Sequence, residues 1–228
     1  MTWSVGTTVT PGPDSQITVS YGHQQGADAF SADGHYALTA RTTISGSYSN
    51  TIGTQLENLQ TQLNQSRFNA NGQFVNSQSG SSPLGLVNSL ALQPGVFRFN
   101  TVDLNVQTTL DRDILSLGLI YSVQTSTGGG VTTANSSTVK TVTSQWVHQL
   151  RPDLLSIASI SYSQQNFAND GGILGGRNTT IVGAAALQYT ISDTLNASLR
   201  HAYYGRNGGG TAQNIYQNLL ILSITKQF

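Results

Sequence analysis

The side chains that could carry acid–base chemistry are few: four histidines, nine aspartates and one glutamate among 228 residues. His148 stands five residues before Asp153, and His201 stands inside an alternating polar and apolar segment. The sequence has no Gly-x-Ser-x-Gly elbow and no His-Glu-x-x-His pair, which would set a nucleophile or a metal beside a base. The sequence therefore predicts no catalytic residues and a protein that is not an enzyme.

Glycine clusters and cysteine usage bear on cofactors. The glycine clusters lack the Lys-Ser/Thr of a phosphate-binding loop and are typical of loop tips; they lie at 128–130, 171–172, 175–176 and 208–210. Cysteine is absent, which excludes disulfides and thiolate metal sites. We therefore expect no cofactor and no metal. The net charge of zero gives no argument for nucleic acid as a partner.

The composition restricts the class of protein. Charged residues make up 9% of the chain, against roughly 25% in an ordinary soluble domain. No apolar run approaches the ~18–20 residues of a membrane helix. Three classes of protein have this composition: a membrane barrel with a polar lumen, a secreted β-solenoid and a disordered segment. Nine Tyr, seven Phe and two Trp argue against disorder.

Alternation with a period of two dominates the chain and indicates β-strands. In the segment from Leu115 to Val123, the odd positions are Leu, Leu, Leu, Tyr and Val, and the even positions are Ser, Gly, Ile and Ser. Most of the expected strands have 9–14 residues, enough to cross a bilayer at a tilt. There are eleven of them, at roughly 2–10, 15–24, 29–39, 42–53, 97–110, 114–127, 137–149, 154–167, 178–191, 195–206 and 215–228.

The connections between these strands alternate between short and long. Short ones such as Pro11 to Asp14 and Asp111 to Asp113 alternate with longer ones such as Gly22 to Asp28 and Gly128 to Ser136. Outer-membrane barrels have tight periplasmic turns and long extracellular loops. We therefore expect one domain over residues 1–228, an antiparallel transmembrane β-barrel with a long loop insertion at about 53–97. Leu56, Leu59 and Leu63 predict a short amphipathic helix in that insertion.

The last expected strand ends in an aromatic residue, Phe228, with Leu220, Leu222 and Ile224 at the same parity. Barrel-assembly machinery recognises a C-terminal strand of this kind, so we expect that machinery and outer-membrane lipid as partners. Lys226 departs from the pattern, because an apolar residue is usual at its position. Its stem can lie in hydrocarbon while its ammonium reaches the headgroups.

Two sets of residues follow from the expected barrel. Aromatic residues near strand ends are typical of the membrane interface; they are Trp3, Tyr21, Tyr48, Tyr121, Tyr162, Tyr203 and Phe228. Polar side chains of the other parity are expected to line the lumen; they are Arg98, Asn105, Gln107, Ser116, Ser122, Asn196, Ser198 and Arg200. If Arg98, Arg200 and Arg206 converge, they favour anionic solutes; scattered rim charges are the alternative.

Stretches from Val5 to His23, from Tyr36 to Ser49 and from Trp146 to Asp153 resemble the outer-membrane β-barrel proteins found with exopolysaccharide export and PEP-CTERM sorting systems. The similarity extends over most of the chain. It implies an envelope location and partners in polysaccharide secretion. It implies no catalytic residues, because none is known for the family.

Strand number and export leave questions open. Bacterial single-chain barrels normally have an even number of strands, so we expect about 12. Either Ser66 to Asn76 holds a further strand, or N-terminal strands are absent. Met1 to Val5 lack the basic and apolar regions of a signal peptide, so that signal is absent from this sequence.

The sequence favours a porin-like or secretory conduit in the bacterial outer membrane, with exopolysaccharide as its substrate. Two alternatives stay open: a structural or binding barrel that anchors an envelope assembly without transport, and a secreted β-rich adhesin.

Overall fold

The fold is known from a computed structural model. It describes residues 3–24, 27–54, 56–57, 60, 64, 66–68, 74–76, 96–127, 136–167, 176–192, 194–208 and 214–226. No helix among these residues is long and apolar enough to cross a membrane.

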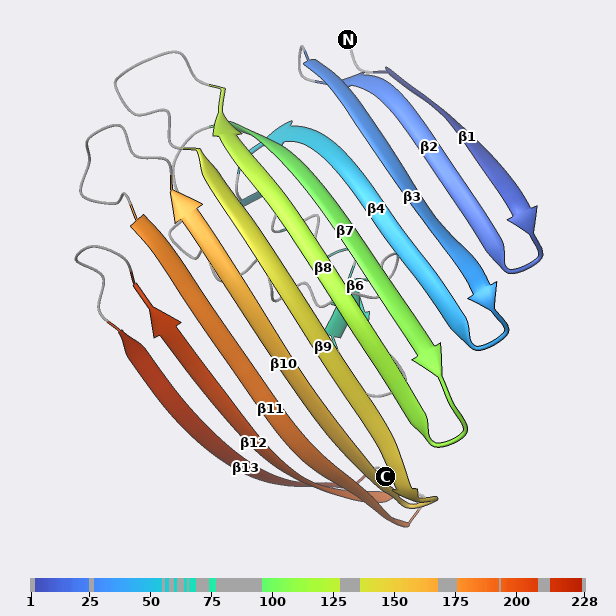
Figure 1. Ribbon diagram of the computed structural model, residues 1–228, viewed down its shortest axis with the longest axis vertical. Coiled ribbons are helices and arrows are strands. Elements are labelled where there is room, and N and C mark those ends of the chain that lie inside the picture. The colour runs from blue at the N-terminus through green and yellow to red at the C-terminus, as the bar shows by residue number, and fades with distance from the viewer. Residues whose placement is uncertain are drawn as a thin grey trace.

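The described chain is all-β, and eleven strands form one large sheet (Figure 1). They are β1 (Trp3–Gly12), β2 (Ser15–Gln24), β3 (Ala27–Thr39), β4 (Thr42–Gly53), β7 (Phe97–Thr109), β8 (Asp113–Ser126), β9 (Ser137–Arg151), β10 (Leu154–Phe167), β11 (Gly176–Ser192), β12 (Leu195–Asn207) and β13 (Ile215–Lys226). They lie in chain order, and each is antiparallel to the next. The eleven strands expected from the sequence are confirmed, within a few residues at each end.

Alternating side chains explain why these segments pair as one sheet. In β8, Leu115, Leu117 and Leu119 are exposed on one face, while Gly118 and Ile120 are buried on the other. Successive side chains of a strand point to opposite faces, so one register fixes the faces of the neighbouring strands as well. Away from the turns the register runs without a shift from β1 to β13, which gives the sheet two distinct faces.

Short turns gather at one end of the sheet, which we call the turn end; the other is the loop end. Figure 1 shows the turns between β1 and β2, β3 and β4, and β7 and β8 side by side. Backbone hydrogen bonds join neighbouring turns, from Thr109 N to Arg41 O at 2.8 Å and from Gln149 N to Arg112 O at 2.8 Å. Irregularities of register occur close to four of the five turns, as between Val9 and Gly12, where they end the regular pairing.

The expected alternation of short and long connections holds with one correction. β2 runs to Gln24 and β3 begins at Ala27, so the connection expected from Gly22 to Asp28 is only residues 25–26. The strands continue because His23 and Asp28 still pair across the ladder. The other connections at the loop end are longer, and the longest runs from 54 to 96 between β4 and β7.

Among its described residues, the long insertion adds no strand to the large sheet. β5 (Ser66–Phe68) and β6 (Phe74–Asn76) pair only with each other, in a separate two-stranded sheet. The alternation over Ser66 to Asn76 therefore reflects a short hairpin, and its interpretation as a barrel strand is wrong. Leu56, Glu57, Gln60 and Asn64 have helical backbone, as the leucine spacing predicts. Leu59 and Leu63 lie outside the described residues.

The edges of the large sheet are β1 and β13, which are not paired with each other within the described chain. Eleven strands in antiparallel order leave the first and the last running in the same direction. Direct closure would therefore require a parallel ladder, unlike all the pairings observed. The sheet is open, whereas the sequence predicted a closed barrel of about 12 strands.

Candidate functional site: a two-faced sheet with aromatic belts

One face of the large sheet carries hydroxyl and amide side chains, and we call it the polar face. Hydroxyl pairs form rungs between neighbouring strands: Ser20 with Ser31 at 2.6 Å on β2 and β3, Thr101 with Ser122 at 3.0 Å on β7 and β8, and Thr141 with Ser163 at 3.0 Å on β9 and β10. Thr141 and Ser163 are 2% and 4% exposed. Each pair satisfies both hydroxyls, which would be costly to bury alone.

Seven of the eight residues expected to line a lumen share the polar face by register. On β7 and β8 these are Asn105, Gln107, Ser116 and Ser122, and on β12 they are Asn196, Ser198 and Arg200. Asn105 and Ser122 are buried among neighbouring side chains, whereas Gln107 and Arg200 are exposed. The sequence pattern thus found one face of the sheet. That this face lines a lumen stays a prediction.

Arg98 is the exception and corrects the expected set. It lies an odd number of residues from Asn105 on the same strand, so its side chain belongs to the opposite face. Its partners in the ladder are Ile52 and Thr125. Arg200 and Arg206 share the polar face on β12 but stand six residues apart, roughly 20 Å along a strand. The three arginines therefore do not converge.

The other face, which we call the apolar face, exposes large hydrophobic side chains from one edge of the sheet to the other. The exposed set includes Val5, Val9, Ile17, Leu104, Val106, Leu115, Leu117, Leu119, Val142, Ile160, Leu187, Leu199, Leu220, Leu222 and Ile224. Leu117 is 46% exposed although it stands at the middle of β8. Soluble proteins rarely expose a continuous apolar surface of this extent, and a bilayer is a solvent that would cover it.

All six described aromatics of the expected interface set lie on the apolar face, near the loop end. They are Trp3, Tyr21, Tyr48, Tyr121, Tyr162 and Tyr203. The rings of Trp3 and Tyr21 meet edge to face at 5.7 Å, and Phe30 joins Tyr48 at 5.6 Å. Phe228, the seventh, lies outside the described residues. We call this line of rings the loop-end belt.

The loop-end belt is staggered relative to the hydrogen-bonded rows of the sheet. One such row holds Thr7 on β1, Tyr48 on β4, Tyr121 on β8 and Asn207 on β12. Trp3 lies four residues from Thr7 towards the loop end, and Tyr203 lies four residues from Asn207 towards the turn end. From each strand to the next, the belt therefore moves by about one residue towards the turn end. A ring of residues at constant height around a barrel of tilted strands shows the same shift.

A second line of aromatic residues lies on the apolar face near the turn end. Tyr36 on β3, Trp146 on β9 and Tyr189 on β11 form it, and we call it the turn-end belt. Counted from the row that holds Tyr48 and Tyr121, these residues lie four, six and ten positions towards the turn end. This belt therefore has the same stagger as the loop-end belt. The two belts stand about six residues apart along a strand, roughly 20 Å. Outer-membrane barrels carry two such girdles around an apolar band.

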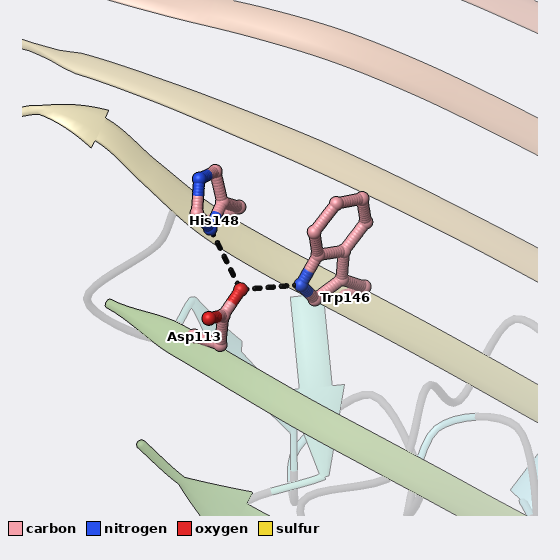
Figure 2. A network of polar contacts seen from close by, with 3 residues as sticks. All are labelled: Asp113, Trp146 and His148. Carbon is pink, nitrogen blue, oxygen red and sulfur yellow. Dashed lines mark hydrogen bonds and ion pairs between the residues drawn. The ribbon is translucent and has the colours of Figure 1, made fainter. Parts of the chain in front are cut away.

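A cluster at the turn end joins the second belt to a carboxylate (Figure 2). The indole Nε1 of Trp146 donates a hydrogen bond to Oδ1 of Asp113 at 2.7 Å, and Nδ1 of His148 lies 2.7 Å from the same oxygen. Asp113 begins β8, and the other two residues are on β9. Sequence reasoning missed Asp113, because only the pairing of β8 with β9 brings it beside Trp146-x-His148.

A second pair of histidine and aspartate lies on the apolar face at the loop end, where Nδ1 of His23 and Oδ1 of Asp28 are 3.1 Å apart. The two pairs are therefore at opposite ends of the sheet. Among the described residues, no group of three or more His, Cys, Asp or Glu could hold a metal ion. His201, between Ala185 and Leu220, lies on the apolar face.

Comparisons with known proteins bear on the fold. No protein-family model matches the chain, and no curated protein matches it. Among solved structures, the chain is similar to a loop L8 deletion mutant of OmpT, an outer membrane protein of Vibrio cholerae, with 7% identity and a TM-score of 0.58 over 97% of this chain and 62% of that one. It is also similar to outer-membrane expressed OmpT of Vibrio cholerae, with 7% identity and a TM-score of 0.57 over 98% of this chain and 64% of that one.

The chain thus spans less than two thirds of the length of these structures. At this identity the likeness concerns the fold alone. The large antiparallel sheet has the fold of outer-membrane β-barrel proteins.

Proposed function

We propose that the chain spans the bacterial outer membrane as a porin-like or secretory conduit, with the polar face along the path of the solute. The observation that carries this proposal is the division of one sheet into a hydroxyl-rich face and an apolar face bounded by two staggered aromatic belts. In a membrane barrel the apolar band faces lipid and the polar face contacts water. The long connections then lie outside the cell and the short turns in the periplasm.

The chemistry of the polar face supports a neutral, hydrated solute. Its described charged or titratable groups, tyrosine aside, are Asp33, His35, Asp103, Arg200 and Arg206, spread over β3, β7 and β12. Between them lie Ser, Thr, Asn and Gln side chains, which can exchange hydrogen bonds with sugar hydroxyls. We therefore propose a polysaccharide as the solute, and exopolysaccharide-secretion proteins as partners.

Planar-bilayer conductance of the refolded chain tests transport directly. We expect discrete conductance steps, and we expect liposomes containing the protein to swell in neutral oligosaccharides. Absence of channels at every voltage, with the protein inserted, would overturn the conduit. Swelling with small salts but not with sugars would overturn polysaccharide as the solute.

A structural barrel without transport is the second candidate, and one observation favours it. Phe97 and Phe99, at the loop end of the polar face, are only 3% and 7% exposed, and their rings lie 6.2 Å apart. Buried aromatic rings on this face favour a narrow or blocked path. Insertion without conductance is the result expected for such a barrel. Heat-modifiable migration in detergent gels is expected for both kinds of barrel and would exclude a secreted adhesin.

A further inference from the structure

Three cationic side chains lie on the apolar face at its loop end. Arg98 is on β7, Lys140 on β9 and Arg177 on β11, so they occupy every second strand across the middle of the sheet. Lys140 and Arg177 are exposed, and Arg98 is half-buried. We call these three residues the cationic row.

The cationic row lies beside or beyond the loop-end belt, away from the apolar band. Lys140 pairs with Tyr121, a member of the belt. Arg98 stands four residues beyond Val102, the partner of both Tyr48 and Tyr121. Arg177 stands four residues beyond Ile181, the partner of Tyr162. All three therefore stand at the depth where lipid headgroups meet the belt, if the sheet spans a membrane.

The contacts of the cationic row leave its positive charges available to bind an anion. Lys140 Nζ lies 5.8 Å from the ring centroid of Tyr121, and Arg177 Nη2 donates to Oε1 of Gln164 at 2.9 Å. Asp28 is close enough to Arg98 to interact electrostatically, but its Oδ1 contacts His23. No carboxylate among the described residues forms an ion pair with any of the three.

The turn end differs. There, Arg41 is paired with Asp111 at 3.1 Å, and Arg151 with Asp153 at 3.3 Å. Two of the three arginines at the turn end are therefore neutralised by a carboxylate, whereas Arg112 forms no ion pair with a described carboxylate. The loop end of the apolar face instead presents three cations, none of them in an ion pair with a described carboxylate, and this concentration of positive charge favours an anionic ligand on that side.

We propose that Arg98, Lys140 and Arg177 bind the phosphate groups of phosphorylated lipid headgroups in the leaflet at the loop end. This inference rests on the proposed membrane location. A guanidinium donates two parallel hydrogen bonds to a phosphate, and a lysine contributes a point charge on a long stem that can extend along the wall.

The test uses the refolded full chain in micelles of a zwitterionic detergent, with fluorescent bisphosphorylated lipid A as the probe and its dephosphorylated form as the reference. Each basic residue near an anionic surface strengthens binding about fivefold. We therefore expect the variant Arg98→Gln/Lys140→Gln/Arg177→Gln to bind lipid A at least about tenfold more weakly. The matched control Arg41→Gln/Arg112→Gln/Arg151→Gln, at the turn end, should bind as the parent does.

Equal weakening in both variants, or equal binding of dephosphorylated lipid A, would overturn the proposal. Displacement of lipid A by millimolar inorganic phosphate would assign the site to a free anion instead and would also overturn it. Heat-modifiable migration of each variant shows that it is folded, and Lys140→Arg should keep the affinity if the triple variant does not fold. If the parent chain fails to insert into bilayers, the proposed function fails on its own, whatever the micelle experiment gives.

Discussion

Trp146 donates its indole hydrogen to Oδ1 of Asp113 across 2.7 Å, from the neighbouring strand and at the turn end of the apolar face. The same oxygen is 2.7 Å from Nδ1 of His148. The carboxylate of Asp113 thus fixes the orientation of the Trp146 ring and joins it to the first residue of β8. An indole with its N–H directed to a polar group and its ring over apolar surface is suited to a membrane interface.

Asp113→Ala should lower the urea midpoint of unfolding of the protein in detergent or lipid, because Trp146 and His148 both lose their acceptor. Asp111→Ala is the control, since the side chain of Asp111 is 86% exposed and its described ion pair is with Arg41 alone. We expect the control to unfold close to the parent. Equal midpoints for the two variants would show that the cluster does not stabilise the turn end.

Two adjacent residues of β8 test which face meets lipid. Leu117→Arg should destabilise the inserted protein by ~2–4 kcal/mol, the cost of an arginine near the bilayer midplane. Ser116→Arg, on the polar face, should cost much less and change the conductance or its ion selectivity instead. Urea unfolding in lipid vesicles measures the first effect, and bilayer recording measures the second. The reverse order of stabilities would place the polar face in lipid.

The sequence predicted the strands because period-two alternation and turn residues are local signals, and eleven strands follow from them. It also found, from the same local signals, aromatic residues that share one face near one end of the sheet; that they lie at a membrane interface stays a prediction. It could not reveal the stagger of the two belts, which depends on the register of nine strand pairs at once. Asp113 was missed because its partners stand 33 and 35 residues away. Arg98 was assigned to the wrong face because its position was read by polarity, although its parity on β7 differs from that of Asn105.

The pairing of β1 with β2 depends on the absence of a side chain at Gly22. A Cβ there would stand 2.5 Å from the carbonyl oxygen of Trp3 and 3.0 Å from the Cα of Ser4, both backbone atoms that cannot turn aside. Gly22→Ala should therefore separate the two strands and destabilise the protein by about 1–3 kcal/mol. A Cβ at Gly183 meets nothing within 4 Å, so Gly183→Ala is the matched control. Trp3 fluorescence and urea unfolding should change in the first variant alone; similar losses in both would contradict the steric explanation.

The rung between Thr141 and Ser163 offers a test of the polar face itself. Both side chains are buried and their oxygens are 3.0 Å apart, so removing one hydroxyl leaves the other without its partner. Thr141→Val alone should cost about 1–3 kcal/mol of unfolding free energy. Adding Ser163→Ala should recover part of that loss, because no unsatisfied hydroxyl then remains. Urea unfolding of the parent, both single variants and the double variant measures the coupling. Additive losses of unfolding free energy would mean that water already satisfies each hydroxyl. This part of the polar face would then be hydrated.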